Sequence, residues 1–189
     1  MTDDLVILVD EDDNPIGTAP KSVVHGADTP LHRAFSCFIY NRRGDVLLQQ
    51  RANAKATWPG VWSNSCCGHP RPGEELEAAT RRRLREELGI DAGELVLALP
   101  RYRYRAEHLG VVENEICPVL IGPCTSQPRP TLGEVVGVMW FPWRRFVEGV
   151  RRSLDPFFTE LSPWCREETL LLAEGDELER FLSAHTSSR

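Results

Sequence analysis

A helical pattern over residues 75–88, with strand-like segments before and after it, constrains the fold more than any other feature of this chain. Glutamates occupy the start of the pattern, where negative charge suits a helix N-terminus. Gly89 follows the pattern as a stop signal. The apolar residues recur at helical spacing: Leu76, Ala79, Leu84 and Leu88. We therefore expect a helix that ends at residue 88.

The other expected elements are short strands followed by helices. Strand patterns cover 5–9, 34–40, 46–51, 94–106, 113–121 and 134–141, and helical patterns cover 143–150 and 164–184. Residues 41–45 contain Gly44 between two strand patterns, which predicts a hairpin. Because strands and helices do not alternate regularly, we expect an α+β or layered α/β domain rather than a Rossmann-type sheet. No repeat, low-complexity tract or linker divides the chain, which predicts a single domain over residues 1–189.

Composition argues against several functional classes. The chain has 189 residues and a net charge of −6, so it has no general surface for nucleic acid. Its acidic N-terminus does not resemble a secretory signal, and no apolar run is long enough for a membrane helix. The six cysteines include no Cys-x-x-Cys pair. We therefore expect reduced thiols in a cytoplasmic protein with no membrane partner.

Chemically active residue types recur at a spacing of two. Cys67 and His69 would project from one face of an extended backbone, and so would Glu113 and Glu115. His25 and His32 add two imidazoles upstream. Together these residues predict a metal site and an acid–base pair assembled from separate parts of the chain.

One loop and helix resemble the Nudix box, a motif that holds a divalent cation against a diphosphate. The matching stretch is Gly68, five residues, Glu74, seven residues, and then Arg82-Arg83-Leu84-Arg85-Glu86-Glu87-Leu88-Gly89-Ile90. The box usually has Arg-Glu where this chain has Arg82-Arg83, so a cation replaces a metal-binding carboxylate. The resemblance implies a Nudix-type α/β/α layered sandwich with a mixed central sheet.

The flanking segments make the resemblance more specific. In chain order they are His25 and His32, Trp58-Pro59-Gly60-Val61-Trp62, Asn64-Ser65-Cys66-Cys67-Gly68-His69-Pro70, Tyr102-Arg103-Tyr104-Arg105 and Glu113-Asn114-Glu115. This series resembles the type I isopentenyl-diphosphate isomerases from about residue 5 to residue 164. The resemblance implies an isomerase of isoprenoid biosynthesis that converts isopentenyl diphosphate into dimethylallyl diphosphate. We expect it to be a monomer whose partner is this small prenyl diphosphate.

The resemblance also implies two metal sites. Imidazole-rich sites suit Mn²⁺ or Zn²⁺ better than Mg²⁺, and this ion would be held by His25, His32, His69, Glu113 and Glu115. In the second site, Mg²⁺ would be held by Glu87, the backbone carbonyl of Cys67 and phosphate oxygens of the substrate. From the residues alone, Glu87 is equally well explained as a solvated residue paired with Arg83, four positions earlier.

The remaining roles follow from the same family. The catalytic residues would be Cys67, Glu115, Tyr104 and Trp164, and the diphosphate would be bound by Lys21, Arg51, Lys55 and Arg83. In the favoured order Glu115 protonates the alkene with the help of Tyr104, and Cys67 removes the second proton; the reverse order stays open. Cys66 is interpreted as a packed residue, and His108 and His185 as ordinary histidines.

Two other functions compete with this hypothesis. A Nudix hydrolase acting on a nucleoside diphosphate derivative would need several carboxylates in the box, and Arg83 argues against it. A catalytically silent metal- or diphosphate-binding protein would be expected to lack the thiol or Glu115, and both are present. The native metal, the flux direction and a lid role for the N-terminus stay open.

Overall fold

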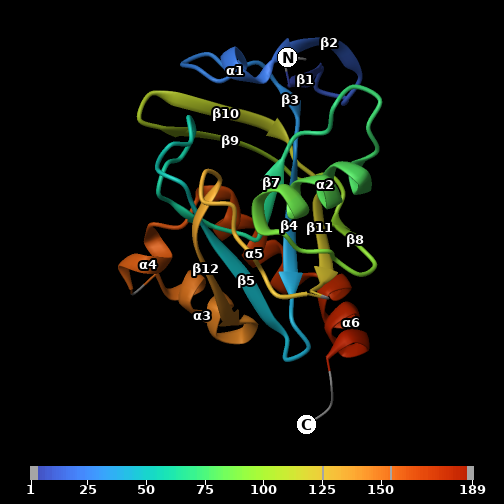
Figure 1. Ribbon diagram of the computed structural model, residues 1–189, viewed down its shortest axis with the longest axis vertical. Helices are drawn as coiled ribbons and strands as arrows, with labels where there is room; N and C mark the ends of the chain where they lie inside the picture. The colour runs from blue at the N-terminus through green and yellow to red at the C-terminus, as the bar shows by residue number, and fades with distance from the viewer. Residues whose placement is uncertain (1–3, 125, 154, 187–189) are drawn as a thin grey trace.

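The computed structural model describes residues 4–124, 126–153 and 155–186. A five-stranded sheet has the order β2-β1-β3-β10-β9 and is called the upper sheet from its place in Figure 1. Its strands are β1 (Leu5–Val9), β2 (Pro15–Pro20), β3 (His32–Arg33), β9 (Arg103–His108) and β10 (Val111–Ile116). The short helix α1 (Lys21–Val24) follows β2.

The second, central sheet has the order β12-β5-β4-β11-β8. These strands are β4 (Phe35–Tyr40), β5 (Asp45–Arg51), β8 (Val96–Leu99), β11 (Val119–Pro123) and β12 (Val135–Pro142). Two short strands extend it: β6 (Trp62–Ser63) pairs with β5, and β7 (Cys66–Gly68) pairs with β4. The sheet is mixed, because β4 and β11 are parallel whereas the other pairs are antiparallel.

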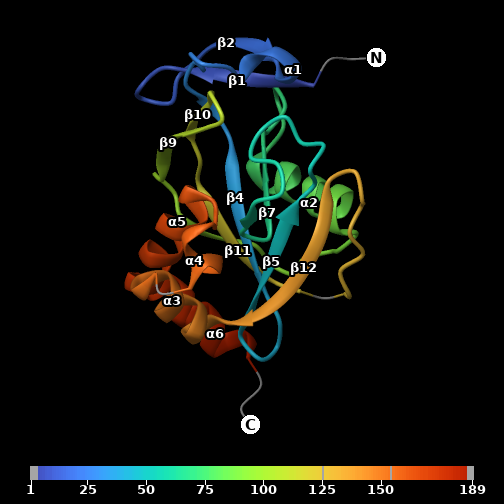
Figure 2. The ribbon, with the colours of Figure 1, turned by 90° about the vertical axis from the view of Figure 1, so that its left-hand side faces the viewer.

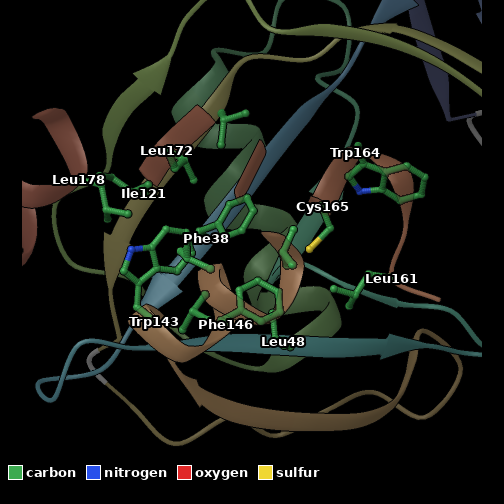
Figure 3. Close-up of a cluster of buried hydrophobic side chains, with 14 of the residues drawn as sticks. Phe38, Leu48, Ile121, Trp143, Phe146, Leu161, Trp164, Cys165, Leu172 and Leu178 are labelled. Atoms are coloured by element: carbon green, nitrogen blue, oxygen red, sulfur yellow. The ribbon is translucent and has the colours of Figure 1, made fainter. Parts of the chain in front are cut away.

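Helices cover both faces of the central sheet, which confirms the expected layered sandwich. Figure 2 shows α2 (Leu76–Leu88) on one side, and α3 (Trp143–Arg152), α4 (Pro156–Thr159), α5 (Pro163–Glu174) and α6 (Asp176–His185) on the other. Alternating residues of β4 supply the two cores. Phe38 packs in the cluster with α3, α5 and α6 (Figure 3). Tyr40 belongs to the same cluster, whereas Cys37 and Ile39 pack with α2.

The chain passes from the upper to the central sheet twice, along two neighbouring paths. The first path runs from β3 into β4 through Ala34, and the second runs from β10 into β11 through Cys117 and Pro118. The paths are parallel, and backbone hydrogen bonds from Ala34 N to Ile116 O (2.9 Å) and from Ser36 N to Pro118 O (3.1 Å) join them. The two sheets are therefore fixed to each other at this crossing.

Three expected elements were wrong in extent. The expected strand over 113–121 is divided into β10 and β11, because Pro118 lacks an N–H for the ladder. The expected strand over 94–106 is divided into β8 and β9 at the same corner, where Tyr102 O accepts a hydrogen bond from Cys117 N (2.9 Å). The single helix over 164–184 is two helices, because Gly175 has an extended backbone (φ −89°, ψ 152°). The sequence patterns also did not anticipate six short elements: β2, β3, β6, β7, α1 and α4.

The other expected helices and strands were confirmed in type. The hairpin forms at its tip, where Tyr40 pairs with Val46, and then the two strands diverge. All six cysteines are free thiols. Within the described ranges, no helix has the length and apolar character needed to cross a membrane.

Gly89 ends α2 in the left-handed conformation (φ 61°), and its N–H reaches Arg85 O and Leu84 O. A Cβ built on Gly89 would lie 3.0 Å from the backbone oxygen of Arg129. We predict that Gly89→Ala destabilises the fold, since a left-handed non-glycine residue costs about 1–2 kcal/mol. For a chain of this size the Tm should fall by roughly 2–8 °C in differential scanning calorimetry.

The matched control is Gly133→Ala, because a Cβ there meets no atom within 4 Å and Gly133 has no positive φ. Equal Tm changes in the two variants would contradict the role given to the left-handed cap of α2.

Candidate active site

A cavity of about 360 Å³ lies beside the crossing of the two sheets. Its wall includes every functional residue expected from the sequence except His32, which is fully buried. The polar and aromatic side chains that line it include Lys21, His25, Arg51, Lys55, Thr57, Cys67, His69, Arg83, Glu87, Tyr104, Glu113, Glu115 and Trp164. Residues from distant parts of the sequence thus meet around one space.

The register of the upper sheet places three of these functional groups in a row. Glu115 of β10 lies opposite His32 of β3 on one side and opposite Tyr104 of β9 on the other. Directly paired residues point to the same face of a sheet. Strand pairing alone therefore brings an imidazole, a carboxylate and a phenol together.

Three imidazoles and one carboxylate form a compact group. Ligand atoms of His25, His32, His69 and Glu115 all lie within 4.8 Å of one another. His69 Nε2 is 3.2 Å from both His32 Nε2 and Glu115 Oε1, and His32 Nε2 is 3.4 Å from the same oxygen. His25 Nε2 is buried and has no hydrogen-bond partner among the described residues. This donor set and this unpartnered nitrogen fit a divalent transition metal.

Burial and the contacts with Glu115 together set the protonation of this group. Burial lowers the pKa of His25 and of His69 to about 4, so both imidazoles are neutral near pH 7, as metal ligation requires. Burial also acts to lower the pKa of His32, but the hydrogen bond and charge of Glu115 outweigh it and raise that pKa. The two histidines in turn hold the pKa of the Glu115 carboxyl well below its usual range, against the effect of burial.

Glu113 lies outside the compact group but is joined to it through Tyr104. The Tyr104 hydroxyl lies 2.8 Å from Glu113 Oε2 and 2.9 Å from Glu115 Oε2. Burial and the charge of Glu115 raise the pKa of Glu113 to about 7, although Arg51 opposes this rise. A phenol has one proton, so Tyr104 donates to one carboxylate at a time.

The thiol of Cys67 comes from the central sheet. Cys67 pairs with Ser36 across β7 and β4, and its sulfur lies 3.5 Å from Ser36 Oγ. The thiol donates to Asn64 Oδ1 (3.2 Å), and Trp164 Nε1 donates to the same oxygen (3.1 Å). Burial raises the pKa of Cys67 to about 12. Cys66, by contrast, is fully buried, in agreement with its interpretation as a packed residue.

The four expected cations also line the cavity. Lys55 Nζ is 3.3 Å from Glu87 Oε1, and Arg83 Nη2 contacts the same oxygen, so Glu87 does pair with Arg83 as the sequence allowed. Arg51 donates to the carbonyl and hydroxyl of Thr57 at 2.8 and 3.0 Å. Lys21 Nζ lies 4.0 Å from Asp4 Oδ2.

Sequence reasoning missed three residues near this cavity. Asn64 belongs to the motif over residues 64–70, but only its contacts show that it accepts hydrogen bonds from both the Cys67 thiol and the Trp164 indole. Glu134 contacts Lys55 and Arg83 from outside the motifs. Glu168 is fully buried, neither of its carboxyl oxygens has a hydrogen-bond partner in the described part of the chain, and burial raises its pKa well above the usual value. No local pattern marks the last two.

Comparisons with known proteins identify the family and the fold. The sequence profile of the NUDIX domain matches residues 30–165. A crystal structure of DR0079 from Deinococcus radiodurans superposes with a TM-score of 0.65 at 18% identity, covering 87% of this chain and 96% of that one. The MutT protein from Methanosarcina mazei gives a TM-score of 0.60 at 18% identity, with coverages of 78% and 96%. At these identities the two structures support the fold alone.

Sequence relatives are more specific. The isopentenyl-diphosphate Delta-isomerase of Saccharopolyspora erythraea is 49% identical over 170 residues, which cover 89% of this chain and 86% of the relative. The protein of the same name from Mycolicibacterium vanbaalenii is 48% identical over 172 residues, with coverages of 90% and 92%. The chain therefore belongs to the NUDIX domain family and, within it, to the isopentenyl-diphosphate Delta-isomerases.

Proposed function

We propose that this chain interconverts isopentenyl diphosphate and dimethylallyl diphosphate, with residues 1–189 acting as one domain. The observation that carries the proposal is the shared cavity: it gathers a thiol, a carboxylate–phenol pair and a group of cations in a member of the isomerase family. We further propose that the protein works as a cytoplasmic monomer on this small substrate, and the six free thiols support a reducing compartment.

The reaction moves a double bond by adding one proton to the terminal alkene carbon and removing another from the carbon nearer the diphosphate. An unactivated alkene is a weak base, so the transition state has the character of a tertiary carbocation. The site needs a well-placed acid, a base and exclusion of water. We assign the two proton transfers to Cys67 and to the Glu115–Tyr104 pair, whose hydrogen bond (2.9 Å) keeps a proton beside the carboxylate.

The diphosphate would bind at the four cations, Lys21, Arg51, Lys55 and Arg83. An arginine guanidinium can donate two hydrogen bonds to phosphate oxygens at once, whereas a lysine ammonium acts as a point charge. Mg²⁺ would be held by Glu87, the Cys67 carbonyl and the substrate, since this ion takes few protein carboxylates and completes its shell with phosphate and water. It would supply positive charge to the diphosphate.

Mn²⁺ or Zn²⁺ would be held by His25, His32, His69 and Glu115, with Glu113 as the fifth proposed ligand. The ion would favour the carboxylate form of Glu115 over the carboxylic acid. The ring centroid of Trp164 lies 5.3 Å from that of Tyr104. Its π-face would stabilise the carbocation by a cation–π attraction of about 0.5–2 kcal/mol.

Hydrolysis of a nucleoside diphosphate derivative is the rival activity in this fold. It normally needs several carboxylates in the box, and here Arg83 occupies one of those positions and contacts Glu87. Incubation with ADP-ribose would reveal such an activity as release of phosphate-containing products.

We predict that Cys67→Ala and Glu115→Gln each lower isomerisation by about 10²–10⁴-fold, the usual contribution of a positioned acid or base. The assay follows conversion of isopentenyl diphosphate in deuterated water, by label incorporation and by product. Cys124→Ala is the thiol control, because Cys124 is only partly buried and is not part of the cavity wall. Near wild-type turnover of either site variant would refute the assigned chemistry.

We predict that the protein binds Mn²⁺ through the histidine group and that His69→Asn weakens this binding by at least about 10-fold, the lower range seen even for residues behind a metal ligand. Free Mn²⁺ measured by electron paramagnetic resonance during a titration gives the affinity without an activity assay. His185→Asn is the control, since His185 hydrogen-bonds Phe181 O on α6. If both variants bind Mn²⁺ as the wild type does, the ion sits elsewhere.

A further inference from the structure

Glu134 is a carboxylate that the proposed chemistry does not use. It lies one residue before β12 and is not part of the cavity wall, yet it contacts two cations that are. Its Oε2 accepts from Lys55 Nζ and from Arg83 Nη2, the latter at 2.9 Å. Glu87 contacts the same two nitrogen atoms through Oε1. Lys55, Arg83, Glu87 and Glu134 are called the ionic ring below.

The ionic ring pairs two cations with two carboxylates. Both cations are shielded from solvent, with side-chain exposures of 18% for Lys55 and 11% for Arg83, so salt screens their charges little. Each is shared between the same two carboxylates. The Lys55 and Arg83 contacts hold the pKa of Glu134 at about 2, against the effect of burial. Glu134 is therefore ionised near neutral pH, and its negative charge lies beside both cations.

Among the described residues, the other two cations of the cavity form no ion pair with Glu87 or Glu134. Arg51 donates to Thr57 and to Trp58 O rather than to a carboxylate of the ring. Lys21 is 4.0 Å from Asp4. Glu86 is a third carboxylate on the same guanidinium, which it contacts through Nη1 at 2.8 Å, but its side chain is 41% exposed, so solvent screens its charge more than those of Glu87 and Glu134.

The two carboxylates of the ring differ in how firmly they are held. Glu87 is 2% exposed on α2, and its second oxygen accepts from Gln49 Nε2 (3.1 Å). Glu134 has a side-chain exposure of 33%, and among the described residues its side chain is held by the two cations alone. Removing the charge of Glu134 leaves Lys55 with Glu87 as its carboxylate partner among the described residues, and leaves Arg83 with Glu87 and the exposed Glu86.

We propose that Glu134 is a specificity-determining residue, which makes the cavity select a diphosphate carrying a divalent cation over the free diphosphate. This inference rests on the proposed function, because it assumes that diphosphate binds at Lys55 and Arg83. Free diphosphate brings only negative charge to cations that Glu87 and Glu134 already neutralise. A diphosphate that carries a divalent cation brings two positive charges as well, which offset the two carboxylates.

The test measures binding of inorganic diphosphate by isothermal titration calorimetry in metal-stripped buffer and again with Mg²⁺. Glu134→Gln should bind metal-free diphosphate about tenfold or more tightly than the wild type. The substitution removes a negative charge that, in the wild type, lies beside two weakly screened cations. Glu177→Gln is the charge-matched control: Glu177 pairs with Arg180 on α6, and this change should leave binding unaltered. Adding Lys55→Gln to Glu134→Gln should abolish the gain.

The outcomes separate the inference from the proposed function. If the wild type binds Mg²⁺-diphosphate but Glu134→Gln gains no metal-free affinity, the role of Glu134 is wrong and the function stands. An equal gain in Glu177→Gln would overturn the inference by reducing it to net charge. If the wild type does not bind Mg²⁺-diphosphate, the diphosphate site itself fails. Retained Mg²⁺-diphosphate binding by Glu134→Gln shows that this variant is folded.

Discussion

The buried carboxylate of Glu115 is the interaction on which the cavity depends. A charge removed from water must be paired or hydrogen-bonded, or it is strongly destabilising. Glu115 is 5% exposed and is surrounded by His32, His69 and Tyr104 at 2.9–3.4 Å. Two of these neighbours are supplied by strand register alone. A one-residue slip of β10 would turn Glu115 to the other face, and the histidine group would lose its carboxylate.

Neither sheet contains the whole site. The upper sheet supplies the carboxylates, the phenol and His32, whereas the central sheet supplies the thiol through the pairing of β7 with β4. The two parts keep a fixed relation because β3 continues into β4 beside β10 and β11, with parallel pairing on both sides of the crossing. The proposed proton transfers require such a fixed relation, since small misplacements of reacting groups reduce rates strongly.

Sequence patterns predicted what is encoded locally. The apolar spacing and Gly89 predicted α2 to the residue at its C-terminal end, and the spacing of Cys67, His69 and Glu115 predicted residues that share one cavity. The sequence patterns missed the points where an expected strand or helix is interrupted. The division at Pro118 depends on which sheet each half of the strand joins. A glycine such as Gly175 can also be tolerated inside a helix, so it did not predict the end of α5. Glu134 could not be identified from the sequence, because the cations it contacts are 51 residues or more away in the chain. Glu168 could not be identified because only the folded structure shows that its carboxyl oxygens are buried without a hydrogen-bond partner among the described residues.

Asn64 shows how positioning outweighs any single attraction here. Its Oδ1 accepts from both the Cys67 thiol and the Trp164 indole, and its amide nitrogen donates to Cys37 O and Cys66 O. One buried amide thus fixes the Cys67 thiol and the Trp164 indole together. Cation–π attraction from the indole is worth about 0.5–2 kcal/mol, whereas enzymes lower barriers by about 8–23 kcal/mol. Correct placement can supply about 7–11 kcal/mol. If Cys67 and Trp164 act as proposed, their placement by Asn64 can therefore contribute more than the cation–π attraction does.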